Sequence, residues 1–152
     1  MIKVINGDLF ETHAEAICHQ VNCQGVMGSG VALQVKQNYP HVYEVYKEFC
    51  KENKGDLLGK VLPVGCHGNS GNLTVYNLFA QDKYGYDGEC YTSYEALEKC
   101  LDILETTLPE NTKIAMPYLM GCHRGGGDWN VVYRMLEDTF KKRDVLLYKK
   151  GE

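Results

Sequence analysis

The stretch GVMGSGVA, at residues 25–32, is the strongest indication of fold and binding site in this chain. It places three glycines between a predicted strand and a predicted helix. Glycine lets a backbone adopt positive φ and come close to a ligand. The start of a helix exposes unpaired N–H groups and the positive end of the helix dipole. The stretch therefore predicts a binding site for an anion that requires no lysine.

A second glycine-rich stretch, GCHRGGGDW at residues 121–129, also lies between a predicted strand and a predicted helix. Neither stretch is a Walker motif or the G-x-G-x-x-G dinucleotide fingerprint. Glycines also serve turns and tight packing, and for either stretch alone this structural explanation is the better one. Both stretches occur together, however, and the second has little packing to explain its glycines. We therefore expect the two loops to hold two linked phosphates.

The order of apolar segments predicts the fold. Strands are expected at residues 2–5, 16–21, 61–64, 73–79, 113–116 and 144–148. Helices are expected to begin near Ser29, at Pro40, at a Thr92-Ser93-Tyr94-Glu95 capping box and behind the N-cap Asp128. A turn at residues 68–71 predicts a hairpin, which makes the sheet mixed. This alternation predicts the α/β class, as a three-layer α/β/α sandwich with a mixed sheet of about six strands. Both glycine stretches then fall at carboxyl ends of strands, where such sheets bind ligands.

Composition limits the classes of function. The chain has 152 residues, which fits one domain spanning residues 1–152. Its net charge of −4 weighs against a broad nucleic-acid surface. Its seven cysteines form no Cys-x-x-Cys pair, so we expect reduced thiols, no metal site and no cofactor. The sequence shows no signal-peptide pattern and no membrane-length apolar run, so the expected location is the cytoplasm.

Three motifs follow one another in the chain: VINGDL at residues 4–9, HQVNCQGVMGSGVA at residues 19–32, and Met116-Pro117 followed by residues 121–129. In this order they resemble the motifs of the macrodomain family, which binds ADP-ribose. The resemblance covers nearly the whole chain and implies a single macrodomain. It is strongest to three small stand-alone types: terminal ADP-ribose glycohydrolases, antitoxin-type DNA de-ADP-ribosylases and yeast-type ADP-ribose-1″-phosphate phosphatases.

The resemblance implies a set of binding residues. The Asp8 carboxylate would accept a hydrogen bond from the adenine amino group, the Leu9 N–H would bind the ring edge, and Tyr148 would lie against the ring. Asn22 would reach the distal ribose hydroxyls. The diphosphate would contact the N–H groups of Gly28, Ser29, Gly30 and Val31, and the second loop, with Gly121, Cys122, Arg124, Gly125, Gly126 and Gly127, would close over the other side. Three alternatives stay open: Asp8 as a turn residue, Tyr148 as a core residue and Asn22 as a support of its own loop.

The candidate catalytic residues are His19, Asp82 and His123. A histidine at the position of His19 is shared with the yeast-type phosphatases, and a neutral imidazole can activate water or protonate a leaving group. Its alternative is a strand histidine bonded to the backbone. The terminal glycohydrolases use a lysine where this chain has Gln81, and an acid near Gly125, which is absent here. A lysine-dependent mechanism is therefore doubtful.

We expect a protein that binds ADP-ribose and hydrolyses a 1″-linked derivative. The candidates are ADP-ribose-1″-phosphate, O-acetyl-ADP-ribose and ADP-ribosylated macromolecules. The alternative is a non-catalytic ADP-ribose reader. No membrane partner is expected, and the acidic net charge weighs against a nucleic-acid partner.

Overall fold

The computed structural model describes residues 1–68, 71–85, 87, 89–122 and 125–150. Within them, a six-stranded sheet has the order β1-β6-β5-β2-β4-β3. Its strands are β1 (Ile2–Asn6), β2 (Ala16–Val21), β3 (Val61–Gly68), β4 (Gly71–Phe79), β5 (Ile114–Pro117) and β6 (Val145–Lys149). All neighbouring strands are parallel except β3 and β4, which form the predicted antiparallel hairpin. The mixed sheet of the sequence analysis is confirmed.

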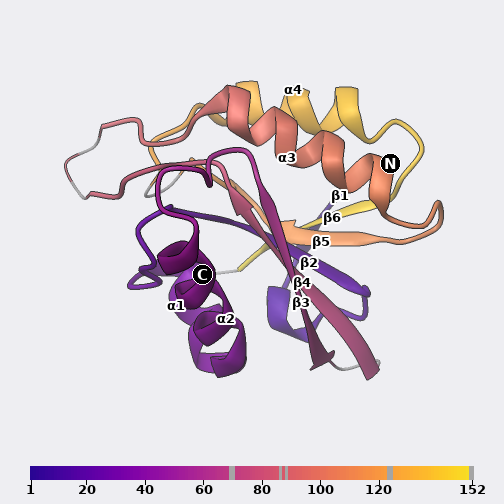
Figure 1. The fold of residues 1–152 in the computed structure, drawn as a ribbon. Helices are drawn as coiled ribbons and strands as arrows, with labels where there is room; N and C mark the ends of the chain where they lie inside the picture. Colours follow the sequence, from indigo (N-terminus) through magenta and orange to yellow (C-terminus); the bar gives the residue numbers. More distant parts are fainter. Residues whose placement is uncertain (69–70, 86, 88, 123–124, 151–152) are drawn as a thin grey trace.

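Helices cover both faces of this sheet, as the predicted three-layer sandwich requires. Figure 1 shows α1 (Gly30–Asn38) and α2 (Pro40–Glu52) on one face, and α3 (Tyr94–Thr107) and α4 (Trp129–Thr139) on the other. Each face has its own buried apolar cluster. Neighbouring residues of β2 show the division, because Ile17 packs with the α1–α2 cluster and Cys18 with the α3–α4 cluster.

The structure corrects one helix start. Ser93, not Thr92, is the N-cap of α3, and its side chain accepts a hydrogen bond from the Ala96 N–H at 3.2 Å. Thr92 instead pairs with Gln81 in an isolated bridge and donates its hydroxyl to the Gly121 carbonyl at 2.7 Å. The predicted capping box therefore lies one residue too early, because Thr92 is held by the second glycine loop.

A short 3-10 helix, η1 (Leu9–Glu11), was not predicted from the sequence. Asp8 is its N-cap and accepts a hydrogen bond from the Phe10 N–H at 2.9 Å. No helix within the described residues is both long and apolar enough to cross a membrane.

A buried arginine joins the far end of α3 to β6. Arg143 is only 4% exposed and its Nε donates to Glu105 at 2.9 Å. Its Nη1 atom donates to the carbonyls of Pro109 and Thr112, at 2.8 and 2.7 Å. The guanidinium thus supplies a donor to the Thr112 carbonyl and a second donor to the Pro109 carbonyl, which also accepts from the Thr112 N–H at 3.0 Å.

We expect Arg143→Met to lower the free energy of unfolding by about 2–4 kcal/mol, because these carbonyls and Glu105 lose a charged donor. Urea denaturation measures the change. The matched control is Arg134→Met, since Arg134 is exposed on α4, and it should change stability by less than about 0.5 kcal/mol. Equal effects of the two substitutions would contradict this role for Arg143.

Candidate functional site

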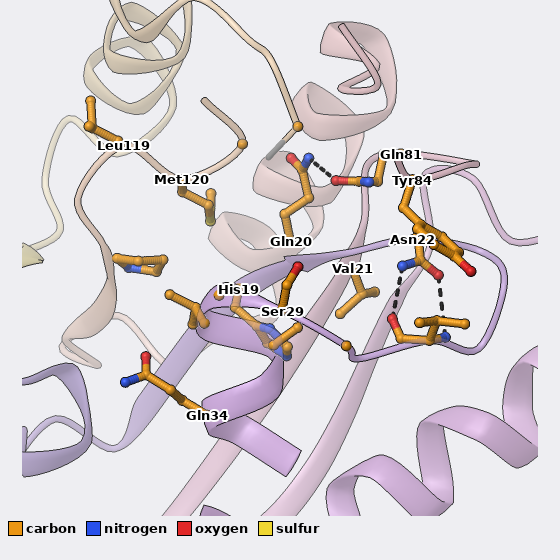
Figure 2. A pocket seen from close by; sticks show the side chains of 18 of the residues that line it. His19, Gln20, Val21, Asn22, Ser29, Gln34, Gln81, Tyr84, Leu119 and Met120 are labelled. Carbon is orange, nitrogen blue, oxygen red and sulfur yellow. Dashed lines mark hydrogen bonds between the residues drawn. The ribbon is translucent and has the colours of Figure 1, made fainter. Parts of the chain in front are cut away.

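A cavity of about 780 Å³ lies where β2 and β5 end and α1 begins. This volume is in the range of sites that hold cofactor-sized molecules. Its lining includes the end of β2, the first loop and the start of α1, and residues 117–121 beyond β5. Gln81 and Tyr84, which follow β4, and Lys150, which follows β6, complete it. Figure 2 shows how side chains from β2, α1 and the segments that follow β4 and β5 lie around this space.

The N-terminus of α1 opens into the cavity without a cap. Ser29 is the N-cap residue, but its side chain makes no capping hydrogen bond. The first bond of the helix runs from the Leu33 N–H to the Ser29 carbonyl at 3.2 Å. The backbone N–H groups of residues 28–32 consequently have no hydrogen-bond partner among the described residues. Other helix starts are closed, since Ser93 and Asp128 cap α3 and α4, and Pro40 begins α2.

The glycines of the first loop leave open space beside this helix start. Gly30 has a φ of +59°, and a Cβ atom built on it would meet no heavy atom within 4 Å. A Cβ on Gly28 would lie 3.5 Å from Val26, which is an ordinary contact. Packing therefore does not explain the glycine at either position. Free N–H groups, a helix dipole and open space together form a site for an anion.

The glycines of the second loop have a different physical origin. A Cβ atom on Gly121 would lie 2.8 Å from the Gln20 Oε1, and one on Gly127 would lie 2.8 Å from the Gly121 carbonyl oxygen. At Gly125 it would lie 2.5 Å from the Thr92 Oγ1, and at Gly126 it would collide with the Glu89 carbonyl. The expectation that this loop has little packing to explain its glycines is wrong. Its backbone rests directly on neighbouring segments, with no room for side chains.

His19 is a buried, neutral histidine in the floor of the cavity. Its Nε2 lies 2.7 Å from the Asn77 Oδ1. Asn77 donates its own Nδ2 to the Leu62 carbonyl at 3.0 Å, so its Oδ1 must accept and His19 must carry its proton on Nε2. Burial lowers the pKa of His19 from about 6.5 to about 4, with the Asn77 bond opposing that shift. The Nδ1 lone pair is buried and has no partner in the described part of the chain.

Comparison with known proteins identifies the family. No protein-family model matches the chain. A DNA ADP-ribosyl glycohydrolase of Mycobacterium tuberculosis is 31% identical, over 97% of this chain and 42% of that protein. An ADP-ribose 1″-phosphate phosphatase of Meyerozyma guilliermondii is 29% identical, over 96% of this chain and 95% of that protein. The solved macrodomain of Mycobacterium tuberculosis DarG matches with a TM-score of 0.84 and 29% identity, over 99% of both chains. The chain belongs to the macrodomain family. It spans less than half the length of the mycobacterial glycohydrolase that it matches.

In this macrodomain, the residues expected at adenine lie beside the cavity and do not line it. Tyr148 pairs with Pro117, a lining residue, but its hydroxyl donates to the Thr12 Oγ1 at 2.9 Å. Leu9 is buried, and one carboxylate oxygen of Asp8 caps η1. Both structural alternatives, the turn role of Asp8 and the packing of Tyr148, are therefore real. The adenine contacts stay a prediction. For Asp8, the predicted contact would use the carboxylate oxygen that does not cap η1.

Asn22 lines the cavity, yet most of its side chain supports its own loop. Its Oδ1 accepts hydrogen bonds from the Gln24 N–H at 2.9 Å and the Tyr46 hydroxyl at 2.9 Å. Its Nδ2 donates to the Val26 carbonyl at 2.8 Å, as Figure 2 shows. A second Nδ2 hydrogen is left over, and it is the group that a ribose hydroxyl could use.

The remaining candidates are placed less favourably or lie outside the described residues. Asp82 is exposed and does not line the cavity, although its carbonyl accepts from the Cys23 N–H at 3.0 Å. Burial raises the pKa of Cys122 to about 11, so its thiol is protonated at neutral pH. His123 and Arg124 fall outside the described residues. The catalytic roles of Asp82 and His123 stay predictions, as does ligand binding by Arg124 in the second loop.

Two polar side chains of the site, Gln20 and Thr92, are not predicted from the sequence. Gln20 lines the cavity and its Nε2 donates to both the Gln81 Oε1 and the Thr92 Oγ1, each at 2.8 Å. The sequence around Thr92 predicts a helix cap and not a contact with the cavity's neighbours. Gln20 belongs to no motif that indicates a functional role, apart from lying next to His19 in sequence. Within the part of the chain that the structure describes, no group of three or more His, Cys, Asp or Glu side chains is arranged to hold a metal ion.

The buried His19 makes stability depend on pH. The unfolded chain binds a proton near pH 6.5, whereas the folded chain binds it only near pH 4. The unfolded state thus holds more protons between these values, and stability falls as the pH is lowered from 7 to 4. The full shift corresponds to roughly 3 kcal/mol. His19→Gln should remove this part of the dependence, as measured by urea denaturation at each pH. His67→Gln, at an exposed position of β3, should leave it intact, and a His19→Gln profile equal to the wild type would refute the explanation.

Proposed function

We propose that this macrodomain binds ADP-ribose, with the diphosphate at the N-terminus of α1. One observation carries the proposal: the uncapped N–H groups of residues 28–32 open into a cavity of about 780 Å³. Backbone donors and the helix dipole favour a diphosphate without any cation, which suits a chain of net charge −4. The names of the relatives support the choice, because both act on ADP-ribosyl compounds.

Strand order gives the ligand a direction. Asp8 and Tyr148 lie at the β1–β6 side of the sheet, whereas Gln81 follows β4 on the other side of β2. Since α1 begins after β2, between these two places, a diphosphate at α1 has adenine on one side and the distal ribose on the other. The distal ribose would then lie near Gln20, Gln81 and the second loop.

We further propose hydrolysis at the 1″ position of the distal ribose. His19 lines the cavity, and the role proposed for it requires its unprotonated Nδ1, which the structure buries, to become accessible to water or to a ribose hydroxyl. With a pKa near 4 it is neutral at pH 7, so it orients a donor and does not serve as a general acid. The reaction would need no covalent lysine adduct, because Gln81 has an amide that is not nucleophilic.

A non-catalytic reader is the second candidate, and the state of Gln81 favours it. Both ends of this amide are already bonded, to the Gln20 Nε2 at 2.8 Å and to the Lys83 carbonyl at 2.9 Å. The same cavity would then recognise ADP-ribose or ADP-ribosylated macromolecules without turnover. A cytoplasmic location is proposed for either function, supported by seven free cysteines.

Ser29→Asp tests the diphosphate site without damaging the fold. A carboxylate at this N-cap would bond to the free N–H groups, stabilising α1 by about 0.5–1 kcal/mol, and would exclude a diphosphate. Calorimetry should show ADP-ribose binding at least tenfold weaker than in the wild type, while the melting temperature is kept or raised. Ser93→Asp, the same change at the cap of α3, should bind normally. Undiminished binding by Ser29→Asp would place the diphosphate elsewhere.

Turnover separates the enzyme from the reader. We expect the wild type to release phosphate from ADP-ribose-1″-phosphate or free ADP-ribose from a modified macromolecule. His19→Gln should lower kcat by about 100-fold, the lower range for a group that acts on a proton in the transition state, with ADP-ribose affinity largely kept. Chromatography of the products and a phosphate assay measure this. Tight binding with no turnover of either substrate would favour the reader.

A further inference from the structure

A cluster of three polar side chains lies between the cavity and the second glycine loop. It consists of Gln20 from β2, Gln81 after β4 and Thr92 before α3, and is called the strut cluster below. The Gln20 Nε2 atom donates one hydrogen to the Gln81 Oε1 and the other to the Thr92 Oγ1, each at 2.8 Å. Figure 2 shows Gln20 extending toward Gln81 along the edge of the cavity. Three segments that are distant in sequence are thus joined at one point.

The strut cluster bonds directly to the backbone of the second loop. The Thr92 hydroxyl donates to the Gly121 carbonyl at 2.7 Å, and that carbonyl also accepts from the Gly127 N–H at 2.9 Å. The N–H groups of Tyr91 and Thr92 donate to the Gly125 carbonyl at 2.7 and 3.0 Å. Thr92 therefore contacts the described part of the loop at two points, at Gly121 through its hydroxyl and at Gly125 through its backbone N–H.

The fit between the strut cluster and the loop leaves no spare space. At Gly125, a Cβ atom would lie 2.5 Å from the Thr92 Oγ1 and 3.0 Å from the Gln20 Nε2. At Gly121, it would lie 2.8 Å from the Gln20 Oε1. The backbone of the second loop therefore packs directly against the side chains of Gln20 and Thr92. The size of these two side chains sets the position of the loop relative to the cavity.

Gln20 keeps its orientation at an energetic cost. Gln81 donates its own Nε2 to the Lys83 carbonyl at 2.9 Å, so its Oε1 can only accept from Gln20. Both hydrogens of Gln20 are thereby used, and its Oε1 is left buried without a partner. Such an unpaired acceptor costs about 1–3 kcal/mol. Among the described residues, the only other buried side-chain atom in this state is the Nδ1 of His19, which also lines the cavity. An orphaned group that persists beside a cavity points to function rather than to stability.

We propose that Gln20 and Thr92 are positioning residues, which hold the second glycine loop at the height that fits the distal ribose. This inference rests on the proposed function, because it concerns a ligand whose distal ribose lies under Gly121 and Gly125. It also gives Gln81 a role as an acceptor in the strut cluster, in place of a reacting group. Neither Gln20 nor Thr92 needs to touch the ligand's reacting atoms.

Thr92→Val tests the inference, because valine keeps the shape of threonine and removes its hydroxyl. We expect ADP-ribose to bind about tenfold more weakly, the fold-change of roughly one lost hydrogen bond. ADP, which has the diphosphate and adenosine but no distal ribose, should bind within twofold of the wild type. Thr92→Ser keeps the hydroxyl and should bind both ligands within twofold. Calorimetry gives the affinities, and melting temperatures show that each variant is folded.

If Thr92 only supported the fold, its loss would lower the affinities for ADP-ribose and for ADP by the same factor. The ratio of these two affinities therefore distinguishes a positioning role from a general structural one. An unchanged ratio in folded Thr92→Val overturns the inference, as does a Thr92→Ser protein as weak as Thr92→Val. If Thr92→Val does not fold, Gln20→Met supplies the same comparison, since methionine has a similar length and donates no hydrogen bond. Wild-type protein that fails to bind ADP-ribose would instead refute the proposed function itself.

Discussion

The parallel pairing of β2 with β5 on one side and with β4 on the other is the constraint on which the site depends. Parallel strands end at the same edge of a sheet, so the segments that leave β2, β5 and β4 meet there. These segments are the first loop with α1, the second loop, and the stretch that begins at Gln81. Buried apolar side chains on both faces of β2, such as Ile17 and Cys18, fix this strand in the middle of the molecule. The cavity exists because the chain returns to the same edge three times.

The two glycine loops look alike in sequence, but their glycines are required for different physical reasons. In the first loop, Gly30 faces open space and the helix behind it is uncapped, so the backbone itself is the binding surface. In the second loop, Gly121 and Gly125 are needed because Gln20 and Thr92 occupy the space where side chains would be. The first loop leaves its backbone free for a ligand, whereas the conformation of the second loop follows from its packing against Gln20 and Thr92. Their combination gives one small domain a free anion site at the first loop and a second loop whose backbone is held in place by packing.

The sequence predicted the fold well because its signals were local. Alternating apolar segments, Pro40 at a helix start and Asp128 at a helix cap each act within a few residues, and the structure keeps all of them. The site was predictable where glycine and helix starts coincide, as at residues 28–32. Prediction failed where partners are distant in sequence. The residues around Thr92 form a local capping pattern, whereas its actual partner, Gly121, lies 29 positions away. In the same way, the partner of His19 is Asn77, 58 positions away. No short-range pattern records such contacts.

The polarity of the cavity's unpaired groups matches the ligand proposed for it. Residues 28–32 offer backbone N–H donors and no charge, which suits the oxygens of a diphosphate. Among the described residues, the two buried side-chain atoms without a partner are both acceptors, the Nδ1 of His19 and the Oε1 of Gln20, and both belong to residues that line the cavity. Buried acceptors at the end of β2 repel an anion, so the anion is expected at the N–H groups of residues 28–32 and not beside this strand. These two residues are neighbours on opposite faces of β2, so the acceptors flank the end of one strand. The free backbone donors therefore call for an anionic centre, and the uncharged polar residues at the end of β2 suit an uncharged group joined to it, such as the ribose of the proposed ligand.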